Sequence, residues 1–374
     1  MNLGIFQQRQ SSPPTDSQRA LFGFLLGLAI MSVLVRFTTI NSYDFGVIQR
    51  GIRMLVSFDN PWEPLSDWTE YYNPPHSVLF LWPLLFVTPS VLQVLGGALL
   101  LAIIFYKKVW VALAWFLTNS VLWVIGTGNV DMVMMGGGVL LLFAGDKLYR
   151  TKRGLGLRTL GYGFLMIKPQ GGAFIAGLYF LLRRDWKGLA LSVFIYGICF
   201  FPLNSSWLAA MAQSPVITTG TVSHSIWAGF GPAAAIVVAG LVAVSRRWKY
   251  WQLGGALAAI LAPYGMPAVP FFFMLTAVPS LAAVPVVIIF SAGLVALTWF
   301  VAPPPGVTDA HMFYKTYLDI YNLGIIGFGL ALACLARPGA RSDEDITVNE
   351  FVGRQLRAVR ARFRRRGGDR PAPL

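Results

Sequence analysis

Two kinds of ionisable side chain stand out in a mostly apolar sequence. Five acids gather between residues 41 and 76, namely Asp44, Asp59, Glu63, Asp67 and Glu70. Lys168 lies inside an apolar segment, where an ionisable group is a candidate functional residue because burying its charge is costly. A carboxylate can act as a general base, and lysine or arginine can bind phosphate oxygens. The acids lack Asp-x-Asp spacing, and the histidines and cysteines lack metal-ligand spacing, so we expect no metal and no cofactor.

The composition places these residues in a membrane protein. The chain has 374 residues, of which 56% are hydrophobic and only 12% are charged, too few charges to cover the surface of a soluble domain. Apolar runs such as 20–40, 91–106 and 281–301 approach the length that crosses a hydrocarbon core as a helix. The alternation typical of a barrel is absent. We therefore predict an all-α polytopic integral membrane protein with about twelve membrane helices, some short or broken.

The positive charge predicts the orientation. It clusters in short loops between apolar runs, at 107–108, 147–158, 183–187 and 246–249. This pattern is typical of cytoplasmic loops and argues against nucleic-acid binding. We expect both termini in the cytoplasm, the 41–76 loop outside, and a location in the bacterial plasma membrane.

Three regions follow from this topology. They are a cytoplasmic segment (1–19), a transmembrane domain (20–336) and a basic cytoplasmic tail (337–374). Apolar residues recur in the tail near helical spacing, which predicts an amphipathic helix on the bilayer surface. A disordered basic tail is the alternative.

The segment around Lys168 requires an unusual topology. The loops 147–158 and 183–187 both have cytoplasmic charge, yet a single apolar stretch of 24 residues, 159–182, separates them. Lys168-Pro169-Gln170 stands in its middle, and proline breaks a helix. We therefore predict two half-helices that meet at this triplet, an arrangement tolerated where it lines a cavity.

Several motifs, taken in order, resemble a known family. Asp44 follows the first apolar run, and Asn60-Pro61-Trp62 and Tyr71-Tyr72-Asn73-Pro74-Pro75 come before the next one. This order resembles the GT-C superfamily of membrane glycosyltransferases, most closely the bacterial polyprenyl-phosphate-mannose-dependent α-mannosyltransferases of glycosyltransferase family 87. The likeness covers about residues 20–280 and includes later patches at Gly128-Asn129-Val130-Asp131, Lys168-Pro169-Gln170, Ser223-His224-Ser225 and Ala262-Pro263-Tyr264-Gly265. Asn129 and Asp131 stand where the family has Gln and Asn, and Pro270 stands where an acid often follows.

The resemblance implies a fold, a reaction and a site. The implied fold is GT-C-like, and the implied reaction moves a sugar, mannose in this branch, from a polyprenyl-phosphate donor to a lipid or glycan acceptor at the outer face. Asp44 takes the place of the essential acid and is the expected catalytic base. The expected donor-phosphate ligands are Arg50, Arg53 and Lys168. The expected acceptor or sugar contacts are Tyr43, Asn129, Asp131, Gln170 and His224.

Each of these assignments has an alternative. Asp44 could be a solvated or helix-capping acid, and Lys168 could reach the interface or pair with an acid. Asp131 could pair with Lys168 or cap the fourth span, and His224 could be an ordinary loop histidine. At the level of the whole protein, the alternatives are a lipid or solute transporter with a site around Lys168, and an inactive relative that serves as an assembly subunit.

The orientation is testable by labelling. A cysteine placed at Ser66 should react with an impermeant thiol reagent added from outside, because basic residues flank the proposed inner ends of the helices. Labelling only after permeabilisation would overturn the orientation.

Overall fold

The chain folds into a bundle of helices. The computed structural model describes residues 14–38, 40, 43–62, 71–214, 225–244, 248–262, 267–300 and 310–335, with residues 353, 357, 360 and 361 of the tail. Every regular element among these residues is a helix, so the predicted all-helical class is confirmed there.

The helices follow one another with short connections. The first half contains α1 (Asp16–Arg36), α2 (Tyr43–Val56), η1 (Pro75–Ser77), α3 (Val78–Leu81), η2 (Trp82–Leu85), α4 (Pro89–Lys107), η3 (Trp110–Leu117), α5 (Asn119–Thr127) and α6 (Asp131–Lys147). The second half contains α7 (Lys152–Met166), α8 (Pro169–Arg183), α9 (Trp186–Ser192), η4 (Val193–Ile198), α10 (Phe201–Gln213), α12 (Ile226–Val244), α13 (Tyr250–Leu261), α14 (Ala268–Leu275), α15 (Ala283–Phe300) and α16 (Ala310–Leu335). Of the four η elements, η4 is a π-helix and the others are 3-10 helices.

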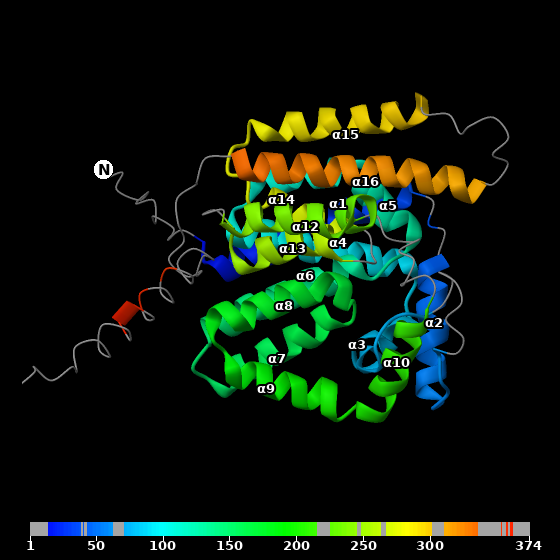
Figure 1. Ribbon diagram of the computed structural model, residues 1–374, viewed down its shortest axis with the longest axis vertical. Helices are drawn as coiled ribbons and strands as arrows, with labels where there is room; N and C mark the ends of the chain where they lie inside the picture. Colours follow the sequence, from blue (N-terminus) through cyan, green and yellow to red (C-terminus); the bar gives the residue numbers. More distant parts are fainter. Residues whose placement is uncertain are drawn as a thin grey trace, which may run out of the picture.

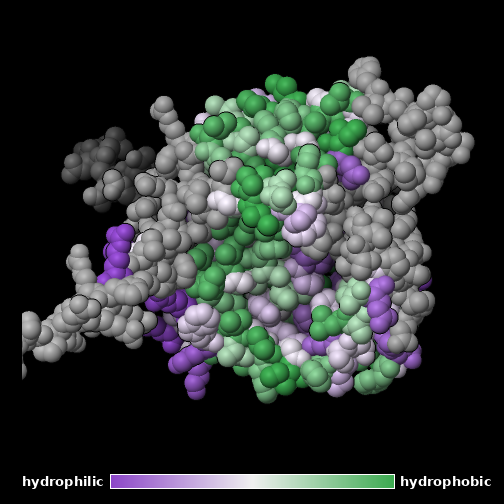
Figure 2. Space-filling view, viewed as in Figure 1, coloured by the Kyte–Doolittle hydropathy of each residue, from purple (hydrophilic) through white to green (hydrophobic). Residues whose placement is uncertain are grey.

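Apolar helices support a membrane location. Two described helices, α1 and α4, are long and apolar enough to cross a membrane, and the number rises to four if each of two bent helix pairs counts as one span. Large apolar side chains are exposed on the outside of the bundle, for example Ile289 on α15 at 70%, and Figure 2 shows the apolar surface that they help to form. Such a surface suits lipid better than water. The predicted total of about twelve membrane helices stays a prediction.

The long helices lie roughly side by side, with α15 and α16 at one edge and α7, α8 and α9 at the other (Figure 1). The helix α2 runs across one end of the bundle, beside α3 and α10. The end of the bundle near α2 is called the tip end below, because the connection between α7 and α8 lies there. The opposite end is called the base end.

The stretch 41–76, which we expected to be a loop, contains the helix α2, whose buried face carries Phe45, Ile48 and Ile52. A later helix, α10, follows a sharp bend: the angle between Trp186–Ile198 and Phe201–Gln213 is 79°. Asn204 stabilises this bend because its amide donates to the carbonyls of Tyr196 and Gly197 at 2.9 Å each.

The predicted half-helices are present. Helix α7 ends at Met166 and α8 begins at Pro169, so the apolar stretch is broken at Ile167 and Lys168. The two helices form a hairpin, since the side chain of Arg158, in the middle of α7, pairs with Asp185, two residues after α8. The entry and exit of this segment therefore lie at the same end, as the charge pattern predicted.

Glycines allow α7 to pack closely on α6. A Cβ on Gly138 would lie 3.0 Å from the carbonyl oxygen of Gly161, and one on Gly145 would lie 3.0 Å from that of Gly154. In the other direction, a Cβ on Gly161 would lie 2.9 Å from the carbonyl oxygen of Gly138, and one on Gly154 would lie 3.0 Å from that of Gly145. The two pairs are seven residues apart on both helices, which fixes an antiparallel register, and such close backbone approach is typical of membrane helices.

This packing generates a stability test on α7. Gly154→Ala should lower the melting temperature in detergent, because the new Cβ would overlap the carbonyl of Leu148, and overpacking typically costs about 1–3 kcal/mol. Gly156→Ala is the matched control, since a Cβ there meets nothing within 4 Å and alanine favours a helix by up to about 1 kcal/mol. Equal melting temperatures for the two variants would contradict the register.

Candidate active site

Lys168 is placed by the break at the tip of the α7–α8 hairpin. Pro169 occupies the first position of α8, where its missing N–H is not needed. The residue before a proline is restricted to extended backbone, and Lys168 has φ −119° and ψ 82°. The lysine therefore leaves the helical path, and its side chain is only 19% exposed.

A second break faces the first. Helix α5 ends at Thr127, and Gly128 caps it in a left-handed conformation with φ +70°. Asp131 is the first residue of α6, where no side chain caps the helix through a hydrogen bond. The alternative that Asp131 caps the fourth span is therefore not observed, and its carboxylate is available to other groups.

Four polar side chains join these breaks to α2. Lys168 Nζ lies 2.8 Å from Asp131 Oδ1 and donates to Asn129 Oδ1 at 2.6 Å. Asn129 Nδ2 in turn donates to Asp44 Oδ2 at 2.9 Å. Asn129 thus connects the lysine to the proposed base, since its amide can accept on one side and donate on the other. These four residues are called the tip cluster below.

Helix α2 delivers Asp44 to this cluster. Its apolar face packs into a small core with Trp62, Tyr71 and Leu92, and Phe45 lies against the second break, where a Cβ on Gly128 would be 3.3 Å from the Phe45 Cβ. Gln49 Nε2 adds a hydrogen bond to the Leu84 carbonyl at 2.6 Å. The register of α2 is therefore fixed by packing and by a hydrogen bond, and Asp44 is held in the first turn.

Burial dominates the electrostatics of Asp44. Loss of solvent raises the pKa of its carboxyl above the ordinary value, and the negative charge of Asp131 adds to this effect. The charge of Lys168 and hydrogen bonds from Asn129 and Thr127 act in the opposite direction without cancelling the rise. A carboxylate with a raised pKa is a stronger proton acceptor once it is ionised, which suits a general base.

Two residues of the site were missed by the sequence analysis. Gln93 on α4 is fully buried and donates to the backbone carbonyl of Asn129 at 2.7 Å, which fixes the position of the second break. Thr127 is a hydrogen-bonding neighbour of Asp44. A polar residue inside the apolar run 91–106 was a usable signal for Gln93, because buried amides need partners. Nothing in the sequence singled out Thr127.

Of the other predicted site residues, the two arginines, Arg50 and Arg53, lie on the exposed surface of α2. An α-helix turns by about 100° per residue, so Arg53, which follows Asp44 by nine residues, lies on the opposite face of α2. Gln170 is half-buried in the first turn of α8, one residue beyond Pro169. Tyr43 begins α2, but its side chain lies outside the described residues, as does His224. The functional roles of all five remain predictions.

The surface near the start of α8 is partly polar. Figure 2 shows hydrophilic residues recessed between apolar ones in the middle of this face, beside the end of α8 that carries Pro169. A polar hollow in an apolar wall is a reasonable place for a charged head group, because the helix breaks next to it are tolerated only beside such a cavity or inside protein.

The pairing of Lys168 with Asp131 can be tested by a double-variant cycle. Lys168→Met leaves Asp131 without its cation, and Asp131→Asn leaves Lys168 without its anion, so each should destabilise the protein by on the order of 1–3 kcal/mol. The double variant should lose less than the sum of the two, measured as melting temperature in detergent. Additive losses would show that the two charges do not interact.

Comparison with known proteins agrees with the motifs. The model of glycosyltransferase family 87 matches residues 71–222, a stretch that contains Asn129, Asp131 and Lys168. No curated protein and no solved structure matches the chain. The resemblance found in the motifs is thus confirmed for residues 71–222, which match glycosyltransferase family 87 and indicate a membrane glycosyltransferase.

Proposed function

We propose that the chain transfers a sugar, mannose by its resemblance, from a polyprenyl-phosphate donor to a hydroxyl of a lipid or glycan acceptor at the outer face of the membrane. The observation that carries the proposal is the tip cluster, in which a buried acid and a lysine are joined through one amide. Transfer needs a proton acceptor and a cation for the leaving phosphate, and these two groups have the required chemistry.

The reaction can be written with these residues. The acceptor oxygen forms a bond to the anomeric carbon of the sugar, and the bond from that carbon to the phosphate oxygen breaks. Asp44 takes the proton of the acceptor hydroxyl, while the polyprenyl phosphate leaves with the bonding electron pair. Asp44 later releases its proton to solvent. In this scheme Lys168 is the cation of the tip cluster that faces the leaving phosphate.

Lys168 retains capacity for the phosphate. An ammonium group has three N–H donors. Among the described residues, Lys168 donates one hydrogen bond, to Asn129, and forms an ion pair with Asp131 at 2.8 Å. Donor capacity therefore remains for a phosphate oxygen. The four side chains of the tip cluster contain two acids and one base, and in the empty site Lys168 is neutralised by its ion pair with Asp131.

A transporter remains the second candidate, because the cluster lies between two broken segments, an arrangement also typical of transporter sites. The two functions differ in detergent solution, where no second compartment exists. Formation of glycosylated product there requires an enzyme, whereas a transporter yields none.

The proposed base is tested by Asp44→Asn. Asparagine has nearly the same size but cannot take the proton, so the rate of transfer from polyprenyl-phosphate mannose should fall by about 10²- to 10⁴-fold. Because the ionised carboxylate is required and its pKa is raised, the wild-type rate should fall, as the pH is lowered, at a pH above the ordinary carboxyl value of 3.8.

Asp59→Asn is the matched control, since Asp59 follows α2 and is exposed. It should transfer sugar at the normal rate. Normal transfer by the Asp44 variant, with loss of transfer in the Asp59 variant, would assign the active site to the region of Asp59 instead. Normal transfer by both would remove the general-base mechanism.

A further inference from the structure

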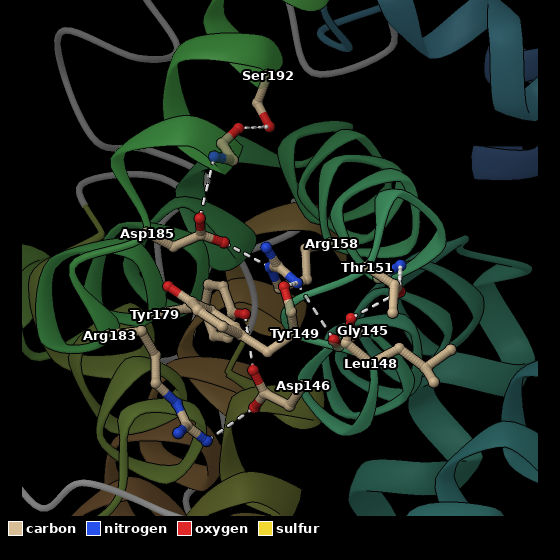
Figure 3. Close-up of polar contacts among 12 residues, drawn as sticks. Gly145, Asp146, Leu148, Tyr149, Thr151, Arg158, Tyr179, Arg183, Asp185 and Ser192 are labelled. Atoms are coloured by element: carbon tan, nitrogen blue, oxygen red, sulfur yellow. Dashed lines mark hydrogen bonds and ion pairs between the residues drawn. The ribbon is translucent and has the colours of Figure 1, made fainter.

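A second cluster of charges joins the end of α6 to α7 and α8 (Figure 3). Asp146, near the end of α6, accepts from Arg183 at 2.8 Å and from the Tyr179 hydroxyl at 2.7 Å, both on α8. Arg158 of α7 pairs with Asp185, which caps α9. These two ion pairs, Asp146–Arg183 and Arg158–Asp185, are called the base clamp below.

The Arg158–Asp185 pair is the more deeply buried one. The side chains are 3% and 4% exposed. The guanidinium also donates to the carbonyls of Gly145 and Tyr149 at 3.2 Å and 3.3 Å, and Asp185 accepts from the Gly188 amide at 3.1 Å. A charge pair buried this far is tolerated only with such additional hydrogen bonds. Its bonds reach the end of α6 and the turn after it, so Arg158 fixes α7 along the axis of α6.

The base clamp and the tip cluster are linked through α6. Asp131 begins this helix and Asp146 lies near its end, 15 residues later, which corresponds to about 22 Å of rigid helix. Each acid holds one end of the α7–α8 hairpin, through Lys168 and through Arg183. The glycine contacts of α6 with α7 lie between them and permit close approach. A slip of the hairpin by one residue would move Lys168 by about 1.5 Å.

We propose that Arg158 and Asp185 are positioning residues, which set the reach of the hairpin along α6 and so hold Lys168 against Asn129 and Asp44. The proposal rests on the function assigned above for its catalytic readout, but the position of the tip can be measured without activity. Neither residue touches the substrate, and both act through Lys168.

Three variants test the role. Arg158→Met with Asp185→Leu removes both charges, and replacing a buried pair by apolar residues often preserves folding. Arg158→Asp with Asp185→Arg restores a pair in the opposite sense. Arg153→Gln is the matched control, because Arg153 is exposed on the same helix. Melting temperature in detergent establishes that each variant is folded.

The position of the tip is read by thiol labelling. The native Cys199 and Cys334 are both exposed and are replaced by serine, and Ile167→Cys places a thiol at the fully buried tip position. Labelling should be slow in the otherwise wild-type chain and with Arg153→Gln, and faster with the apolar double variant. The inverted pair should slow labelling only in part, because a carboxylate at position 158 cannot donate to the carbonyls of Gly145 and Tyr149.

The catalytic readout separates positioning from general stability. In the apolar double variant kcat should fall by about 10²-fold, the effect of an approximately 1 Å misplacement. The pH at which the rate falls should also rise. Burial and the charge of Asp131 raise the pKa of Asp44, whereas Lys168 and hydrogen bonds with Asn129 and Thr127 lower it. Moving Lys168 away therefore removes one of the influences that lower this pKa. A purely structural role would leave the rate–pH profile of the folded enzyme unchanged.

The outcomes are distinct. Slow labelling and an unshifted rate–pH profile in the folded apolar variant would overturn the proposal. If the apolar variant does not fold, the inverted pair decides: labelling as fast as in the unfolded chain would also overturn the proposal. Faster labelling in the apolar variant, with no sugar transfer even by the wild-type chain, would support the positioning role and refute the glycosyltransferase function. Faster labelling with the predicted loss of kcat supports both.

Discussion

The arrangement depends on one constraint, the cost of holding Lys168 within an apolar protein. An ammonium group without partners is too costly to bury, so the chain must supply an anion and an acceptor where the helix breaks. It does so by placing a second break opposite the first, which brings Asp131 and Asn129 within hydrogen-bonding distance of the lysine. Gly128 permits that second break, because its left-handed backbone conformation is costly for other residues.

The same constraint determines how α2 contributes. Asn129 satisfies the lysine with its amide oxygen, so its amide nitrogen needs an acceptor, and Asp44 provides it. The asparagine side chain therefore bridges the two groups. The acid of the first loop is therefore part of one polar network with the hairpin tip, although 124 residues separate Asp44 from Lys168 in the sequence. A substitution at the hairpin tip should therefore change the pKa of Asp44 on α2.

Much of the frame could be predicted from the sequence, and the reason is physical. Apolar composition and loop charge indicated helices, and two basic loops around one apolar stretch required a hairpin at Lys168-Pro169. The residue types around the breaks indicated Asp44, Asn129 and Asp131 through their resemblance to a family. Packing, in contrast, is not local. The helical register that places Arg53 opposite to Asp44 became visible only once α2 was recognised as a helix instead of a polar loop. Gln93 and Arg158 act across tertiary contacts that the apolar pattern does not encode.

A cryo-electron microscopy structure of the full chain with a polyprenyl phosphate bound would locate the donor site directly. We expect a phosphate oxygen within hydrogen-bonding distance of Lys168 Nζ, with Asp44 on the side open to an acceptor hydroxyl. A phosphate bound instead at the exposed arginines of α2, with the tip cluster empty and unchanged, would contradict this expectation.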